Sequence, residues 1–422
     1  MPGILALLSC AAWCSPAQEG KLIEVRSANL LNVRTISDQE VRELIGNVHL
    51  VQIEPGEIIR IWCDSARQFV ATNKVELFGH VRITRDGVTV TAPEGVYFGD
   101  ERRAAFTKSV RLEKGAMTLT SAFGEYFADE KKAIFVHDVT VVDSVSSTKS
   151  NALTYFDTEE KSIAVGDVSV TSSENNVTVY GDSLVHFAKR AYTIVPKNPR
   201  LVQIDTSEGG IIDTLVVMAD VMEAYRDTVH RFVAKGNVAM ARNDFVARCG
   251  EAVYLMKRER IGLRDQPVVW HRENQVTGDS IAVTLFEKRL RSIYVKGRAM
   301  AVSRSDSLFR NRFDQLTGRE LTMYFAGNKL ERVEAERNAV SLYYLFEDQT
   351  PNGMNRSSGD RIAIEFQEGK AGRIKVVGGV EGRFFPEPMI AKRESHYNLD
   401  GFRWIEARPK RSNLHVIREA HD

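Results

Sequence analysis

Residues 121–143, SAFGEYFADEKKAIFVHDVTVVD, decide the fold because they hold one full unit of a pattern that the chain repeats. A small residue opens the unit, an aromatic pair follows, charged residues interrupt it, and alternating valines close it. The opening segments that start at positions 63, 92, 121 and 150 are 29 residues apart, and further copies follow as far as position 359. A fixed period of this length predicts a stack of structural repeats.

Apolar and polar residues alternate in each closing segment, which is the pattern of a half-buried strand. The polar positions include His49, Arg82, Arg111, Thr140 and Ser169. The apolar positions, which share the other face, are Val48, Leu50, Val81, Ile83, Val110, Leu112, Val139, Val141, Val168 and Val170.

Short charged stretches lie between the opening and closing segments, as in GDERRA (99–104), ADEKKA (128–133) and DTEEKS (157–162). Such turn-prone stretches predict tight reversals, so neighbouring strands are expected to run antiparallel. Helix signals are nearly absent, and at best a short helix is expected near 37–44.

Small residues interrupt the strand pattern at two places in each unit. A Gly, Asn or Asp precedes each closing valine pair, and Cys63, Ala92, Ser121, Ser150 or Gly181 begins an opening segment. Within a continuous strand pattern such residues indicate a bulge or a sharp bend. Each strand is therefore expected to fold over and join two facing sheets. The predicted fold is all-β, an elongated antiparallel β-jellyroll of stacked bent strands with a trough between the sheets.

The chain divides into four expected parts. Residues 1–17 resemble a secretory signal peptide, with a lipoprotein signal ending at Cys10 as a minor alternative. Residues 18–205 and 206–385 hold the N-terminal and C-terminal repeats, with longer units from about 276. Residues 386–422 form a tail without repeats, in which aromatic residues and cations cluster.

Several classes of function find no support in the sequence. The charges are nearly balanced, with 57 basic and 56 acidic residues and no basic stripe, so no nucleic-acid partner is expected. The nine histidines lack metal-ligand spacing, and neither a nucleophile elbow nor a phosphate loop occurs. We therefore expect no catalytic residue, metal or cofactor. Cys63 and Cys249 are expected to be buried and too far apart for a disulfide.

Three stretches resemble the repeats of the OstA/LptA family: GNVHLVQ, ELFGHVRITRDGVTVTAPEGVYF and AVGDVSVTSSENNVTVYGDSLVHF. The resemblance covers roughly residues 28–385 and is to long OstA-like members of this lipopolysaccharide-transport family. It implies a periplasmic β-jellyroll, open along one side, that shields acyl chains on the way to the outer membrane. The many repeats and the tail leave open whether the chain oligomerises into a bridge or spans the distance alone.

The resemblance implies that the ten apolar closing-segment residues line a lipid trough, while ordinary core packing remains the alternative. Five phenylalanines close to the charged turns could form a ladder at the mouth of the trough or a stacking ladder that fixes strand register. They are Phe69, Phe98, Phe127, Phe156 and Phe187.

The expected partners are lipopolysaccharide and other transport proteins of the same fold. Residues 21–33 alternate well enough to form an edge strand that pairs with such a protein. Residues 397–411 are expected either to dock on a partner or to fold back and cap the last strand. The rival interpretations of the whole chain are a ligand-free structural protein and a polysaccharide-binding β-repeat protein of the cell envelope.

Overall fold

The structure, a computed structural model, describes residues 23–409 except for 37, 55–56, 174–175, 207–211, 227, 229, 244, 288, 307–308, 328, 348–349 and 368–369. The expected signal peptide therefore lies outside the described residues. The chain separates into two compact units, Met1–Val139 (unit 1) and Thr140–Asp422 (unit 2). The boundary expected near 206 falls inside unit 2. Within the described ranges, no helix is long and apolar enough to span a membrane.

Strands make up most of both units. Unit 1 contains β1 (Glu24–Ser27), β2 (Leu30–Ile36), β3 (Gln39–Glu54), β4 (Glu57–Phe69), β5 (Lys74–Arg85), β6 (Val88–Phe98), β7 (Arg103–Phe106), β8 (Val110–Lys114), β9 (Met117–Ser121), β10 (Phe123–Phe127) and most of β11 (Lys132–Val142), with the 3-10 turn η1 (Val70–Thr72). Unit 2 begins with β12 (Ser146–Phe156), β13 (Lys161–Ser172), β14 (Val177–Phe187), η2 (Ala188–Arg190), β15 (Tyr192–Lys197), β16 (Arg200–Thr206), β17 (Ile212–Met218) and β18 (Val221–Tyr225).

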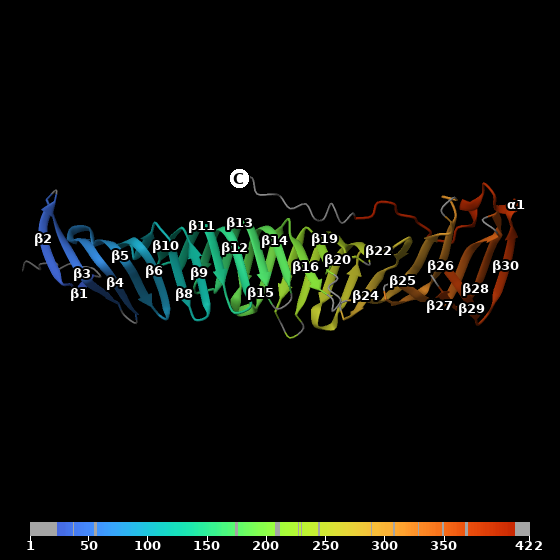
Figure 1. Ribbon diagram of the computed structural model, residues 1–422, viewed down its shortest axis with the longest axis horizontal. Coiled ribbons are helices and arrows are strands. Elements are labelled where there is room, and N and C mark those ends of the chain that lie inside the picture. The colour runs from blue at the N-terminus through green and yellow to red at the C-terminus, as the bar shows by residue number, and fades with distance from the viewer. Residues whose placement is uncertain are drawn as a thin grey trace, which may run out of the picture. The chain divides into compact units, whose positions relative to one another are not determined.

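The remaining elements also belong to unit 2. They are β19 (Arg231–Ala241), β20 (Val246–Leu255), η3 (Met256–Arg258), β21 (Arg260–Arg264), β22 (Val268–His271), β23 (Asn274–Thr277), β24 (Ser280–Phe286), β25 (Arg289–Arg304), β26 (Phe313–Ala326), β27 (Lys329–Glu347), β28 (Thr350–Gln367), β29 (Lys370–Val377), β30 (Glu381–Pro386), α1 (Glu387–Ile390) and η4 (Glu394–Tyr397). In unit 2 the strands follow one another in sequence order (Figure 1).

Neighbouring strands pair antiparallel, as predicted from the charged turns. β5 pairs with β6 from Lys74 opposite Phe98 to Arg85 opposite Val88, and β26 pairs with β27 in the same way. The all-β antiparallel fold is therefore confirmed.

The short helix expected near 37–44 is wrong for the residues that the structure describes there. Gln39 and the residues that follow it lie in β3. Leu44 has a cross-strand neighbour on each side, Leu31 in β2 and Ala66 in β4. Strand pairing on both sides satisfies the backbone and overrides a weak local helix propensity.

Bends occur in the long strands where the small residues predicted them. In β3 the pairing register shifts between Ile45 and Val48, and Gly46 and Asn47 have φ values of 78° and 51°. This left-handed region favours glycine and tolerates asparagine, which explains the residue types at the bend. The same shift recurs in β5, β13, β19 and β25. Each long strand thus has two halves, here called the opening arm and the closing arm after the segments they carry.

The two kinds of arm form two sheets that face each other. Opening arms pair with opening arms, as Leu77 lies opposite Ala66, and closing arms pair with closing arms, as Ile83 lies opposite Ile61. In unit 2 one buried cluster contains Leu201 from a closing arm together with Ile261 from an opening arm. The facing sheets therefore share one apolar interior, and we call the side opposite the bends the mouth. Cys63 and Cys249 are buried and free, as predicted.

The tail folds back onto unit 2. Residues 387–409, here called the C-terminal strap, run from α1 past β26 towards β22 (Figure 1). Met300 and Val302 of β25 pack with Ile390 and Leu399 of the strap in a separate buried cluster. Ala299, next to Met300 in the strand, packs in the interior cluster instead. Since neighbouring strand residues point to opposite faces, the strap covers the outer face of the closing arms.

Two buried glutamines hold the backbone of the strap. The side chain of Gln275 donates to the carbonyl of Arg403 at 2.6 Å and accepts from the backbone N–H of Ile405 at 2.8 Å. Gln315 donates to Asn398 Oδ1 at 2.6 Å and accepts from the backbone N–H of Leu399 at 2.8 Å. Both glutamines therefore anchor a defined stretch of the strap.

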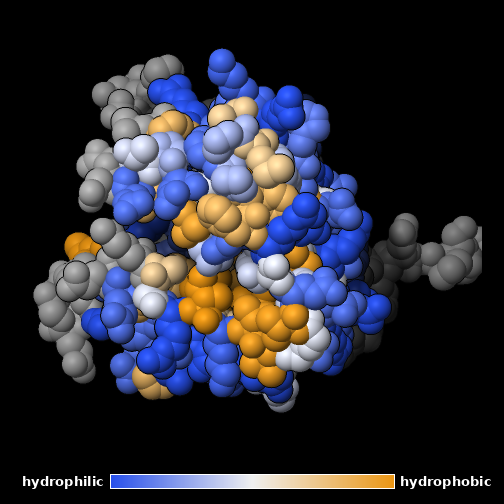
Figure 2. Space-filling model, turned by 90° about the vertical axis from the view of Figure 1, so that its right-hand side faces the viewer, coloured by the Kyte–Doolittle hydropathy of each residue, from blue (hydrophilic) through white to orange (hydrophobic). Residues whose placement is uncertain are grey.

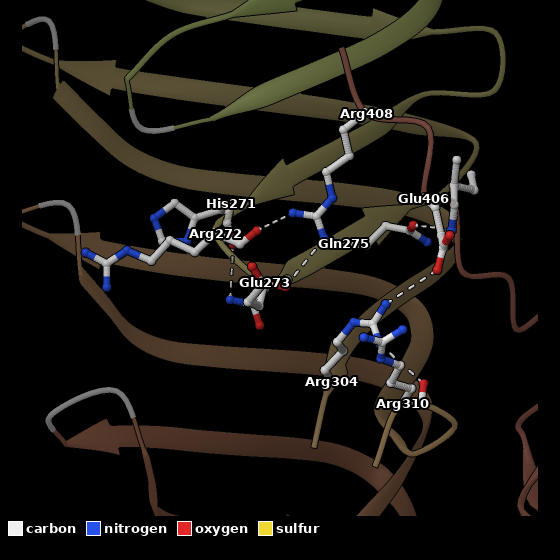
Figure 3. A network of polar contacts seen from close by, with 10 residues as sticks. His271, Arg272, Glu273, Gln275, Arg304, Arg310, Glu406 and Arg408 are labelled. Atoms are coloured by element: carbon white, nitrogen blue, oxygen red, sulfur yellow. Dashed lines mark hydrogen bonds and ion pairs between the residues drawn. The ribbon is translucent and has the colours of Figure 1, made fainter. Parts of the chain in front are cut away.

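Arginines fasten the strap at both ends. Arg304 lies 3.5 Å from Glu406, and Arg408 donates to the carbonyl of Arg272 at 2.6 Å (Figure 3). Nearer α1, the buried Arg312 donates to Glu387 at 3.0 Å and lies 3.4 Å from Glu394. The tail is thus attached to the sheet face rather than confined to the edge of the last strand.

Candidate functional site

The apolar closing-segment residues lie in the interior, between the two sheets. Leu50, Ile61 and Ile83 are neighbours across successive strands, and the row continues through Val90 to Leu112. Eight of the ten predicted lining residues are buried, namely Val48, Leu50, Val81, Ile83, Val110, Leu112, Val139 and Val168. Val141 and Val170 are partly buried. Their contact with a lipid stays a prediction, because the same burial suits an ordinary core.

Phenylalanine rings fill the interior of unit 1 on the side of the opening arms. A Cβ atom at Gly95 would lie 2.9 Å from the ring of Phe106, and one at Gly124 would lie 3.0 Å from the ring of Phe135. Such distances leave no space for a side chain beside either ring. This part of the interior is therefore closely packed by aromatic groups opposite glycines.

Unit 2 instead contains an apolar cavity between its sheets, lined by residues of strands β16 to β21. Its volume is about 30 Å³, smaller than that of a typical small-ligand pocket, and part of it opens to solvent. Its lining residues are Leu201, Leu215, Val217, Met222, Phe232, Val233, Ala234, Met240, Ala252, Tyr254 and Ile261. None of them belongs to the ten residues predicted from the sequence. Alanines at two inward positions are the signal that could have pointed to this cavity.

The five phenylalanines lie at the ends of opening arms and face away from the interior. Tyr97 is buried, so its neighbour Phe98 points to the outer face of the same strand. There the guanidinium of Arg103 stands 4.1 Å from the centre of the Phe98 ring, and Lys74 stands 5.1 Å from that of Phe69. Phe127, Phe156 and Phe187 each have a lysine in the same role. Alternating rings and cations of this kind join neighbouring strands and fix their register.

The residue before the phenylalanine is the one that points inward at the mouth. The Tyr97 hydroxyl donates to Gln52 Oε1, which joins the end of an opening arm to the end of a closing arm. One layer further along, Arg85 donates to the Tyr126 hydroxyl at 2.8 Å and stands 5.6 Å from the centre of its ring. These residues were not predicted from the sequence. The signal was a Tyr or His directly before four of the five phenylalanines, namely Tyr97, Tyr126, Tyr155 and His186.

Unit 2 has contacts of the same kind at its mouth. The His271 ring at the end of a closing arm meets the Phe325 ring of an opening arm at 4.7 Å between centres.

Near the start of the unit, burial lowers the pKa of His186, and the charge of Arg226 lowers it further while Asp143 opposes the shift. Burial alone would raise the pKa of the Asp143 carboxyl, but hydrogen bonds from Val145 and Ser146 and the charge of Arg226 hold it below its ordinary value.

The described residues hold no group of three or more His, Cys, Asp and Glu that could bind a metal ion. Burial raises the pKa of the Cys63 thiol to about 11 and that of the Cys249 thiol to about 12. Both thiols are therefore protonated at neutral pH, the form that lacks nucleophilic reactivity.

Apolar side chains are exposed on the first strands of unit 1 and on the last strands of unit 2. At the first strands, β1 and β2 lie beside β3, and Leu31 and Val33 of β2 are 52% and 59% exposed. Figure 2 faces the end of unit 2 formed by β28–β30, where hydrophobic side chains gather between hydrophilic margins. Val380 and Phe384, 60% and 51% exposed, lie in this last layer.

Comparisons with known proteins bear on the repeats. The family described as OstA-like protein matches residues 20–182, fewer than half of the 422 residues. One similar solved structure is that of LptH from Pseudomonas aeruginosa, described as the LptA-homologous periplasmic component of the lipopolysaccharide transport device. It is 12% identical, the match covers 34% of this chain and 95% of that one, and the TM-score is 0.27. Among curated proteins no match was found. Residues 20–182 therefore belong to the OstA-like family, as the repeats in the sequence predicted.

Proposed function

We propose that this chain binds lipopolysaccharide in the periplasm and shields its acyl chains on the way to the outer membrane, as a transport or bridge protein without enzymatic activity. Membership of residues 20–182 in the OstA-like family supports the proposal, and so does the fold of two facing sheets. The observation that carries it is the apolar cavity between the sheets of unit 2.

The physical reason is the cost of exposing acyl chains to water, about 0.8 kcal/mol for each methylene. A carrier must replace that water with apolar side chains over the length of the chains. The cavity lining supplies such side chains from both sheets. The ten closing-segment residues would extend the same surface through the neighbouring layers.

The partners follow from the same proposal. Edge strands with exposed backbone groups can add a strand of another protein. The exposed apolar residues of β2 make this edge the one expected to pair with a lipopolysaccharide-transport protein of the same fold. Residues 1–17 would direct export across the inner membrane.

Mass spectrometry of protein purified from its native envelope tests the proposal. Lipopolysaccharide should accompany the wild-type chain. A cavity-filling variant, Ala252→Leu, should carry less lipid without loss of stability. A buried charge in Leu215→Asp should abolish binding, whereas Met218→Asp, on the opposite face of the same strand, should not.

Two other outcomes would contradict the proposal. A protein that carries no lipid in any preparation would favour a ligand-free structural role. Glycans without acyl chains would favour the polysaccharide-binding alternative.

A further inference from the structure

We infer that acyl chains enter unit 1 sideways, through a slit along its mouth that two polar pairs, Gln52–Tyr97 and Arg85–Tyr126, hold closed. The inference rests on the proposed function, since it concerns the route by which the same lipid reaches the interior. It assigns to these four residues a role in lipid uptake.

The position of the slit follows from the connections between the sheets. On one side, each bent strand joins the two sheets covalently, as β3 does at Gly46. At the mouth, each turn stays within its own sheet. Residues 86–87 join the closing arms of β5 and β6, and residues 99–102 join the opening arms of β6 and β7. The sheets can therefore separate only at the mouth.

Both pairs cross the mouth in unit 1, as does the hydrogen bond that Gln68 donates to the carbonyl of Ile23 at 3.1 Å. Gln52 is fully buried and Tyr97 is 3% exposed, so the hydrogen bond between them lies at the inner margin of the mouth. The side chain of Arg85 is 12% exposed and, from the closing arm of β5, donates to the hydroxyl of Tyr126. Polar groups at this depth are stable only while they are hydrogen-bonded.

Polar pairs suit a closure that must open repeatedly. When the sheets part, water replaces the lost hydrogen bonds, so the net cost of breaking each pair is small. An apolar seal of the same area would expose its surface to water without compensation. The pairs therefore hold the sheets together at rest and yield when acyl chains insert.

Unit 2 provides an independent case of contacts at this position. His271 and Phe325 meet across its mouth, although the chemistry there is aromatic. Contacts between the end of an opening arm and the end of a closing arm therefore occur in both units.

Stopped-flow fluorescence with cis-parinaric acid, an acyl probe, tests the route in the full chain. Tyr97→Phe and Tyr126→Phe keep both rings and remove only the hydroxyls that close the slit. Each should raise the rate of uptake about fivefold, the factor expected for one hydrogen bond, and leave the amount bound unchanged. Tyr180→Phe, which changes an exposed tyrosine, is the matched control and should behave as the wild type.

A chemical lock tests the opposite direction. With Cys10, Cys14, Cys63 and Cys249 replaced by alanine, the two thiols of a Gln52→Cys and Tyr97→Cys double variant can be joined by a short bismaleimide. The joined protein should lose most of its uptake rate, and the same protein before joining should not.

Equal uptake rates in the tyrosine variants and the control, or full uptake by the locked protein, would overturn the slit and indicate entrance from an end. Absence of probe binding by the wild-type chain would instead overturn the proposed function, and the inference with it. The two failures are therefore distinguishable.

Discussion

The outer faces of the closing arms differ sharply between unit 1 and the later strands of unit 2. In unit 1 the face carries His49, Trp62 and Arg82, with the His49 and Trp62 rings stacked at 5.0 Å and Arg82 at 4.5 Å from the Trp62 ring. In unit 2, Met300 and Val302 occupy this face and are buried by the strap. The repeat therefore constrains the inner face, while the outer face is polar where water covers it and apolar where the chain covers it.

Removing the strap should have the largest effect, and only in unit 2. Truncation after Pro386 exposes Met300, Val302, Phe313 and Leu342, each worth roughly 1.5–3 kcal/mol when fully buried. Hydrogen exchange should show lost protection in β25–β28, with unit 1 strands unchanged as the internal control. Unaltered protection in β25–β28 would mean that the strap contributes no stability.

Replacing one arginine of each region by methionine should give the next largest difference in unfolding free energy. Arg312 is buried against Glu387 and Glu394, so Arg312→Met leaves these carboxylates without their partner and should cost about 3 kcal/mol. Arg82→Met removes an exposed cation from a ring and should cost less than about 1 kcal/mol. Urea unfolding of both variants gives the two values, and similar losses would show that burial under the strap is not the deciding factor.

Gln315→Leu should have a smaller effect on the strap. The change removes both hydrogen bonds to Asn398 and Leu399 and should cost about 2 kcal/mol of unfolding free energy. Thermal unfolding measures the loss. Gln68→Leu, at a buried site of unit 1, is the control that should leave protease protection of the strap unchanged. Equal protection of the strap in Gln315→Leu would contradict the anchoring role.

The smallest expected effect is a dependence on pH in the region under the strap. Burial raises the pKa of the Asp314 carboxyl to about 7, although a hydrogen bond from the backbone of Tyr344 opposes the shift. Between pH 6 and pH 8 the unfolded chain has this group ionised, while the folded protein still binds its proton below pH 7. Stability should therefore fall by about 1.4 kcal/mol as pH rises from 6 to 8. Asp314→Asn should remove this dependence in urea unfolding, and a retained dependence would assign it to another group.

Some features of the site could not be predicted from the sequence, for a physical reason. The phenylalanines were singled out as a ladder, yet Tyr97 and Tyr126, one position earlier, point inward and meet Gln52 and Arg85. These partners lie 45 and 41 residues away. A local pattern shows that two neighbours point to opposite faces, but it does not show what each of them meets.

The sequence by itself determined the strands, their antiparallel order and the bends. These features depend on local causes: alternation with a period of two, charged turns, and Gly or Asn where φ must be positive, as at Gly46. The tertiary structure alone decided the cavity on β16–β21, the contacts at the mouth and the site of the strap. Gln275, for example, holds Arg403 and Ile405 across 128 and 130 residues. Contacts at that separation depend on the shape of the folded sheets, which no short stretch of sequence contains.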